Sequence, residues 1–87
     1  MIKCFFLDRD GVLIKNYGYF CDKNKIKWLN GAFKTIKILN EKKIKIFVVT
    51  NQSGVARGYF NEKDLNDFHS TMVLELSKQK LKIDRFY

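Results

Sequence analysis

The sequence has no proline among its 87 residues and only two cysteines, Cys4 and Cys21. Without proline, an internal repeat or a shift in composition, nothing marks a linker between two domains. The two cysteines form neither a CxxC pair nor a larger framework, so they indicate neither a disulfide scaffold nor a zinc site. We expect one small domain with two reduced thiols.

Long hydrophobic runs are also absent. The segment MIKCFFLDRD at the start has a short apolar run that charged residues interrupt. Such a run is too short for a signal peptide or a membrane span. We therefore expect a soluble, cytoplasmic protein with no membrane partner.

Acidic residues are scarce: nine Asp and Glu face seventeen Lys and Arg, for a formal net charge of +8. This balance could indicate a nucleic-acid partner. However, the lysines are scattered, and Lys42 with Lys43 is their longest run. This distribution favours a solvated basic surface that attracts small anions, and it disfavours a nucleic-acid partner. The sequence leaves the oligomeric state open.

Apolar residues make up 46% of the chain and aromatic residues 15%, which is typical of a folded protein. Residues 3–7 and 44–49 are mainly apolar runs that contain one lysine each, the second rich in β-branched residues. Parallel strands that helices cover on both faces have this pattern, so both runs are predicted to be central strands.

Helical spacing follows each of these runs. Asn30 is a candidate N-cap for a first helix, and Asn61 with Asp64 resembles a capping box for a second helix that extends to about Lys80. Residues 83–87 resemble the approach to a third strand. The order predicts the beginning of a doubly wound, Rossmann-like α/β fold with a parallel sheet.

Ligands of such sheets bind beyond the carboxyl ends of the strands. Asp8 and Asp10 follow the first predicted strand and Thr50 follows the second, so these polar groups should converge. Two neighbouring carboxylates repel unless a cation or a proton separates them, and Mg²⁺ prefers such oxygen ligands together with a substrate phosphate. One aspartate can attack phosphorus while the other protonates the leaving oxygen.

Two aspartates in a DxD pattern are weak evidence alone, because two surface carboxylates have the same spacing. The context strengthens the interpretation. The pattern FLDRDGV…TNQSGVARGYF resembles the haloacid dehalogenase-like phosphohydrolases. DRDG, the pair Gly18 and Tyr19, and TNQSG-x-ARG-x-F resemble, within that family, the D-glycero-D-manno-heptose 1,7-bisphosphate 7-phosphatase and histidinol-phosphatase group. The resemblance covers essentially the whole chain.

This resemblance implies that residues 1–87 are the N-terminal part of a single phosphatase domain, with the sheet truncated after the second helix. It implies that Asp8 is the nucleophile and a magnesium ligand. Asp10 would be the general acid and would also ligate the metal, while Thr50 would stabilise the phosphoryl group. The implied substrate-binding residues are Asp8, Arg9, Asp10, Asn16, Tyr17, Gly18, Tyr19, Thr50, Asn51, Gln52 and Ser53.

Other conspicuous side chains have less specific interpretations. We expect the Arg9 side chain to turn away from the two aspartates, and the lone His69 to be a surface or satisfied residue. Trp28 is expected to anchor the core or a flap over the site. Arg57 fits a second phosphate or a cap of its loop, and both remain open.

The resemblance implies a substrate that is a phosphorylated sugar or another small phosphomonoester. A heptose bisphosphate of lipopolysaccharide or other surface-glycan synthesis fits best, with histidinol phosphate as the alternative and a nucleic-acid 3′-phosphate suggested only by the charge. The family's lysine and second metal-site aspartate, and the zinc loop of many relatives, have no counterpart in this chain. An inactive remnant that keeps phosphate or metal binding therefore remains a second hypothesis.

Overall fold

The computed structural model of the chain describes residues 3–16, 22–50, 58 and 60–87. Strands and α-helices alternate in it, as the sequence predicts, and a short 3-10 helix that was not predicted comes before the first α-helix. The elements are β1 (Cys4–Asp8), η1 (Lys23–Lys25), α1 (Ala32–Glu41), β2 (Lys45–Val49), α3 (Glu62–Lys78) and β3 (Arg85–Phe86).

The three strands form one parallel sheet in the order β1-β2-β3. In this register Leu7 pairs with Val48, and Phe6 pairs with Phe47. Because successive side chains of a strand point to opposite faces, these two pairs lie on opposite faces of the sheet. The parallel sheet and its α/β order confirm the predicted fold class.

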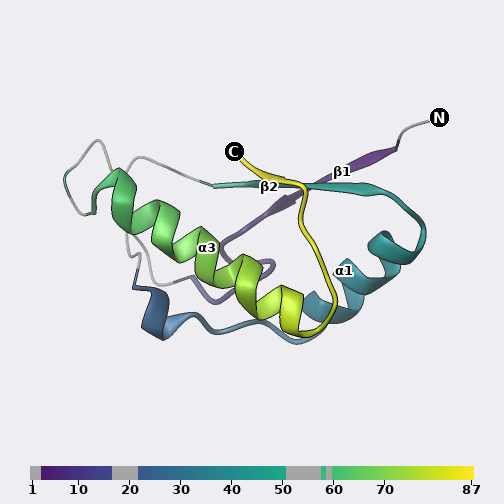
Figure 1. The fold of residues 1–87 in the computed structure, drawn as a ribbon, viewed down its shortest axis with the longest axis horizontal. Coiled ribbons are helices and arrows are strands. Elements are labelled where there is room, and N and C mark those ends of the chain that lie inside the picture. The colour runs from purple at the N-terminus through teal and green to yellow at the C-terminus, as the bar shows by residue number, and fades with distance from the viewer. Residues whose placement is uncertain (1–2, 17–21, 51–57, 59) are drawn as a thin grey trace.

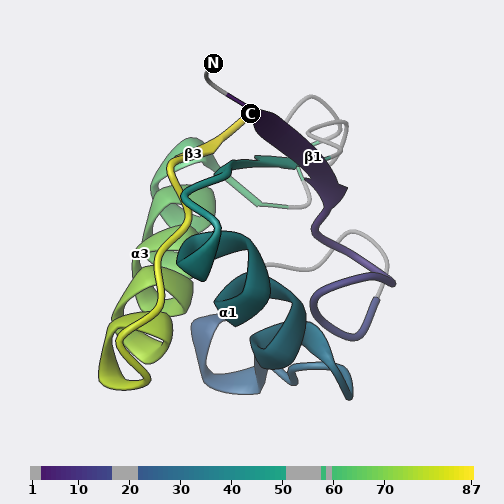
Figure 2. The ribbon, with the colours of Figure 1, turned by 90° about the vertical axis from the view of Figure 1, so that its right-hand side faces the viewer.

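Both helices lie against the same face of the sheet (Figures 1 and 2). We call this the covered face; it carries Ile46 and Val48. The open face is the opposite one, which carries Phe6 and Phe47. The core lies between the covered face and the helices, where five side chains are each 0% exposed: Ile36, Ile46, Val48, Met72 and Leu76.

The prediction of two central strands is correct for β2 and wrong for β1 in the described part of the chain. β1 is an edge strand of the sheet, and its Phe5 and Phe6 are 49% and 61% exposed. An apolar sequence shows that a strand can be buried. The elements packed on the sheet determine how much of the strand is buried. Here α1 and α3 cover one face only, and even Phe5, which pairs with Ile46 on that face, is half exposed at the edge of the sheet.

Helix α3 begins as the sequence predicts. The Asn61 side chain accepts a hydrogen bond from the Asp64 amide at 2.8 Å, and the Asp64 carboxylate accepts one from the Asn61 amide at 3.2 Å. This capping box satisfies two amides that the first helical turn leaves unpaired. The helix ends at Lys78, two residues before the predicted end.

Helix α1 begins one residue later than predicted, because its N-cap is Gly31 and not Asn30. Gly31 has a φ of 86°, a left-handed conformation that glycine adopts readily and other residues adopt rarely. No side chain caps this end, so the turn geometry sets the start of the helix.

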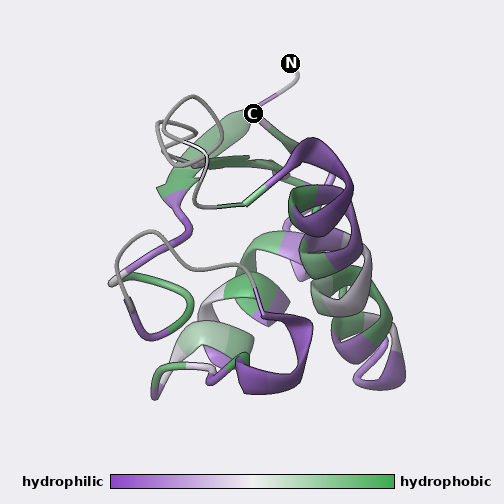
Figure 3. Ribbon diagram, turned by 90° about the vertical axis from the view of Figure 1, so that its left-hand side faces the viewer, coloured by the Kyte–Doolittle hydropathy of each residue, from purple (hydrophilic) through white to green (hydrophobic). Residues whose placement is uncertain are grey.

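Figure 3 shows hydrophilic and hydrophobic residues on both helices, while the strands are mainly hydrophobic. The apolar side of α3 supplies the buried Leu65, Phe68, Met72 and Leu76. Neither helix of the described ranges has the length and apolar character needed to span a membrane.

Two side chains attach the short β3 to the rest of the fold. The Asn40 amide donates to the Lys82 carbonyl at 3.1 Å, and its oxygen accepts the Lys82 amide at 2.9 Å. The Asp84 carboxylate accepts the Ile46 amide at 2.7 Å. The end of α1 and the side chain before β3 therefore both help to hold this strand beside β2.

Candidate functional site at the carboxyl ends of the strands

The carboxyl ends of β1 and β2 lie at the same edge of the sheet. Asp8, the last residue of β1, pairs with Val49, the last residue of β2, and Thr50 follows directly. The Arg9 amide then donates to the Val49 carbonyl at 3.0 Å. The predicted convergence of the two strand ends is thus confirmed. Asp8 is exposed to solvent at this edge.

A tight turn after β1 carries Asp10. The Arg9 carbonyl accepts the amides of Leu13 and Ile14 at 3.1 and 3.0 Å, and Gly11 donates to the Ile14 carbonyl at 2.8 Å. Gly11 has a φ of 81°, which a side chain would disfavour. Leu13 and Ile14 are 1% and 2% exposed, so the core anchors this turn and the backbone of Asp10 with it.

The expectation that Arg9 turns away from both aspartates is wrong. Its Nε donates to Asp10 Oδ1 at 3.0 Å, and its Nη2 donates to Oδ2 at 2.8 Å. Arg9 is 2% exposed, and its guanidinium carbon lies 4.8 Å from the centre of the Phe68 ring. Burial makes this pairing necessary, because a buried charge is costly without a partner.

His69 continues this chain of contacts on α3. Its Nε2 lies 3.1 Å from Arg9 Nη1, and its ring stacks on Phe86 with centroids 4.0 Å apart. Because arginine can only donate, Nε2 must be the accepting nitrogen of a neutral imidazole. Burial and the charge of Arg9 lower the pKa of His69 from 6.5 to about 4. The interpretation of His69 as a satisfied residue is confirmed.

Thr50 is held by Tyr87, the residue that follows β3. Its hydroxyl donates to the Tyr87 carbonyl at 2.8 Å, and its amide donates to the same oxygen at 2.9 Å. A phosphoryl group that takes a hydrogen bond from this hydroxyl must therefore compete with Tyr87. The role of Thr50 in phosphate binding stays a prediction.

Several predicted site residues lie outside the described residues. These are Tyr17, Gly18 and Tyr19 of the predicted flap, Asn51, Gln52 and Ser53 of the second loop, and Arg57. Asn16 is described and exposed to solvent. Trp28 is half-buried beside the core, and its indole N–H donates to the Glu75 carboxylate at 3.0 Å. It therefore anchors the segment before α1 to α3, as a core anchor should.

The described oxygen ligands fit a magnesium ion that is bound partly by substrate. Asp8 is exposed, and the Asp10 side chain is 23% exposed. No group of three or more His, Cys, Asp or Glu side chains suited to a metal occurs within the described ranges. Mg²⁺ commonly uses one or two carboxylates plus phosphate oxygens, so the exposed Asp8 at the strand end suits it, whereas both Asp10 carboxylate oxygens already accept hydrogen bonds from Arg9.

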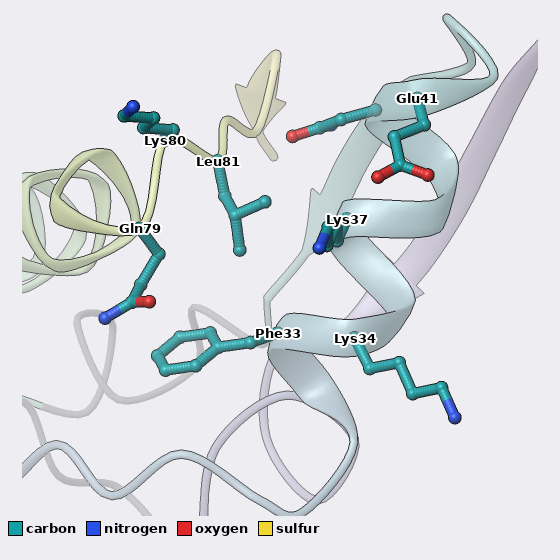
Figure 4. A pocket seen from close by; sticks show the side chains of 8 residues that line it. Phe33, Lys34, Lys37, Glu41, Gln79, Lys80 and Leu81 are labelled. Carbon is teal, nitrogen blue, oxygen red and sulfur yellow. The ribbon is translucent and has the colours of Figure 1, made fainter.

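A groove of about 570 Å³ lies elsewhere, between α1 and the end of α3. Figure 4 shows Phe33 and Leu81 pointing into this space, whereas Lys34 points away from it. None of its lining residues belongs to the strand ends. A second groove of about 490 Å³ includes His69 and Phe86 in its lining. It lies beside the Arg9 contacts and does not include either aspartate.

The link between Asp10, Arg9 and His69 was not predicted from the sequence. Arg9 and His69 are 60 positions apart, and no local pattern connects them. The available signal was a charged arginine directly after a predicted apolar strand, because an arginine that is buried at such a place requires a partner.

Comparisons with known proteins agree with this geometry. The chain is 43% identical over 79 residues to the D-glycero-beta-D-manno-heptose-1,7-bisphosphate 7-phosphatase of Rhodopseudomonas palustris, an alignment that covers 91% of this chain and 44% of the relative. It is 36% identical over 85 residues to the D-glycero-alpha-D-manno-heptose-1,7-bisphosphate 7-phosphatase of Campylobacter jejuni, covering 98% of this chain and 49% of the relative. The chain thus spans about half the length of these curated relatives.

The chain is also similar to solved structures of heptose bisphosphate phosphatases. The D,D-heptose 1,7-bisphosphate phosphatase from B. bronchiseptica, in complex with magnesium and phosphate, matches 99% of this chain with a TM-score of 0.90 and 31% identity. This chain covers 49% of that protein. The model of one family matches residues 5–74, which include both strand ends and most of α3. The chain belongs to the haloacid dehalogenase-like hydrolases.

Proposed function

We propose that this chain carries the nucleophile and the general acid of a magnesium-dependent phosphomonoesterase that works through an aspartyl phosphate. The observation that carries the proposal is the position of Asp8 and the Asp10 turn at the carboxyl ends of two parallel strands, in a member of a hydrolase family. Ligands of open α/β sheets bind at this edge.

In the proposed reaction, an oxygen of the Asp8 carboxylate attacks phosphorus. The bond between phosphorus and the substrate oxygen breaks while the Asp10 carboxyl gives that oxygen its proton. Water then attacks the aspartyl phosphate, Asp10 takes the proton of the water, and inorganic phosphate leaves. The Thr50 hydroxyl would donate a hydrogen bond to the phosphoryl oxygens.

The Asp8 carboxylate and the Asp10 backbone carbonyl would hold Mg²⁺. When bound, the ion supplies positive charge that offsets the repulsion between the carboxylates and an incoming phosphate. Asp8 is the better placed of the two carboxylates for this task, because Arg9 already engages both oxygens of Asp10.

The proposed substrate is a D-glycero-D-manno-heptose 1,7-bisphosphate, from which the 7-phosphate is removed for a surface-glycan precursor. Similarity to relatives that are named for this reaction supports the choice. One of these relatives is named for the beta anomer and the other for the alpha anomer. Both anomers therefore belong in the assay, and histidinol phosphate is the comparison substrate.

The test is release of inorganic phosphate by the purified chain with Mg²⁺ and each substrate. Asp8→Asn should lower the rate by about 10³-fold or more, because it removes the attacking oxyanion. Asp67→Asn is the matched control: the Asp67 side chain forms an exposed ion pair with Lys63 on α3, and its loss should leave the rate unchanged.

Phosphate release from neither heptose anomer, with release from histidinol phosphate, would replace the substrate and keep the chemistry. Equal rates for the parent and Asp8→Asn would reject Asp8 as the nucleophile. Binding of phosphate without any release, measured by ³¹P NMR titration, would contradict the proposed turnover and support a binding fragment.

A further inference from the structure

Among the residues that the structure describes, Arg9 is the only charged one that is buried. It lies between the two aspartates in sequence, yet its own side chain is only 3% exposed. A residue so enclosed has little surface with which to contact a substrate. Its function must therefore act through the groups that it touches.

The contact between Arg9 and Asp10 is a two-point contact. Nε and Nη2 donate to different oxygens of the same carboxylate, at 3.0 and 2.8 Å. A planar guanidinium matches a carboxylate in this way and fixes the orientation of its plane, whereas one hydrogen bond leaves the carboxylate free to rotate. Asp10 is thus held by its side chain as well as by its backbone turn.

Helix α3 and strand β3 hold Arg9 in turn. The Phe68 ring lies under the guanidinium, with 4.8 Å between its centre and the Arg9 Cζ atom. His69 accepts from Nη1 at 3.1 Å, and the Phe86 ring stacks on a face of the imidazole. The guanidinium therefore has an acceptor for each of its three nitrogens and an aromatic face beneath it.

We propose that Arg9 is a positioning residue that fixes the orientation of the Asp10 carboxylate, and that Phe68 and His69 hold Arg9 in place for this task. The catalytic meaning of the orientation rests on the proposed function of Asp10. The orientation itself is a property of this chain that can be measured without turnover.

The alternative is that Arg9 and Asp10 form a structural ion pair whose charge alone matters. Arg9→Lys separates the two cases, because lysine keeps the positive charge and loses the planar pair of donors. We expect Asp10 to occupy one χ1 rotamer in the parent and to average over several in Arg9→Lys. The readout is the set of scalar couplings between the α and β protons of Asp10 in NMR spectra.

The same samples report the Arg9 hydrogen bonds directly. We expect the Arg9 Nε proton to exchange with water about 10- to 100-fold more slowly in the parent than in Asp10→Ala, which removes the acceptor. Lys63→Met is the matched control. It deletes an exposed lysine that pairs with Asp67, and it should change neither the Asp10 couplings nor the Arg9 exchange rate.

If Arg9→Lys fails to fold, His69→Phe serves as the milder variant, because it keeps a ring against Phe86 and removes only the acceptor. We expect partial averaging of the Asp10 couplings in it. Parental Asp10 couplings in folded Arg9→Lys, or in His69→Phe where that variant stands in, would overturn the proposal. A parent Nε exchange rate as fast as that of Asp10→Ala would do the same.

Kinetics add a readout that a purely structural pair would not change. With a phosphorylated substrate, His69→Phe should lower kcat about 10-fold and leave KM within about 2-fold, since misorientation affects the chemical step more than binding. A parent chain without turnover would contradict the proposed function and not the positioning, which the NMR measurements decide.

Discussion

The two faces of the sheet have similar apolar sequences and very different surroundings. On the covered face, Ile46 and Val48 are 0% exposed beneath the helices. On the open face, Phe6 is 61% exposed and Val49 is 40% exposed. Val48 and Val49 are neighbours in β2, so the difference arises from packing and not from residue type. Apolar character allows burial, and only a packed layer provides it.

The open face is nevertheless organised. The rings of Phe6 and Phe47 have centroids 5.3 Å apart, and those of Phe47 and Tyr87 are 5.7 Å apart in an edge arrangement. A row of aromatic contacts thus crosses all three strands or their ends. Such pairs contribute about 0.5–1.5 kcal/mol each beyond the area that they bury. The open face therefore gains part of its stability from contacts within itself.

The largest difference in stability between the two faces is expected when valine is replaced by alanine at two neighbouring positions of β2. Val48→Ala should lower the free energy of unfolding by about 2–3 kcal/mol, because it removes two buried methyl groups and leaves a cavity. Val49→Ala should cost less than about 1 kcal/mol, since its side chain is 40% exposed. Urea unfolding followed by circular dichroism measures both. Equal losses would show that both faces are packed in solution.

An intermediate effect is expected from pH, because the covered side holds a neutral imidazole. His69 takes up a proton near pH 6.5 when unfolded and only near pH 4 when folded. Between these values the unfolded state binds more protons, so the free energy of unfolding falls as the pH is lowered from 6.5 to about 4. After allowance for solvent screening we expect a loss of about 1–2 kcal/mol.

His69→Phe removes this titration and is the control for the other groups that titrate in the same range. Its unfolding free energy should fall less steeply with acid than that of the parent. Parallel curves for the two chains between pH 7 and 4 would show that the folded imidazole protonates normally.

The smallest effect on stability is expected on the open face. Phe6→Ser should lower the free energy of unfolding by about 1 kcal/mol, because the ring is 61% exposed and loses mainly its contact with Phe47. It should lower self-association measured by light scattering, since a contiguous exposed apolar patch promotes aggregation. Unchanged light scattering would mean that the exposed aromatic row does not promote self-association. A large loss of stability would contradict its assignment to an open face.

Local sequence signals predicted the elements well. The capping box of Asn61 and Asp64 involves residues three positions apart, so its chemistry is complete within the sequence. The start of α1 was misplaced by one residue, because the left-handed turn at Gly31 outweighed the side chain of Asn30. The exposure of β1 depends on which layers pack on it, and no local pattern records that.

The site was predictable only in part, because some of its contacts join residues that are far apart in the sequence. Asp8 and Thr50 could be placed together because parallel strands end at the same edge. The direction of the Arg9 side chain depends on Phe68 and His69, which lie on α3, far along the chain. Their aromatic and acceptor groups became partners of Arg9 only when the helix packed on the sheet.

The contact between Asn40 and Lys82 has a consequence for strand alignment. β3 has only two residues in the sheet, so its ladder offers few hydrogen bonds to distinguish one pairing from another. A slip by one residue would turn Phe86 away from the imidazole of His69. The Asn40 side-chain amide forms hydrogen bonds with both backbone groups of Lys82, three positions before β3. This contact, which lies outside the sheet, fixes the position of the chain where it enters β3. A helix residue thereby specifies the register of a strand.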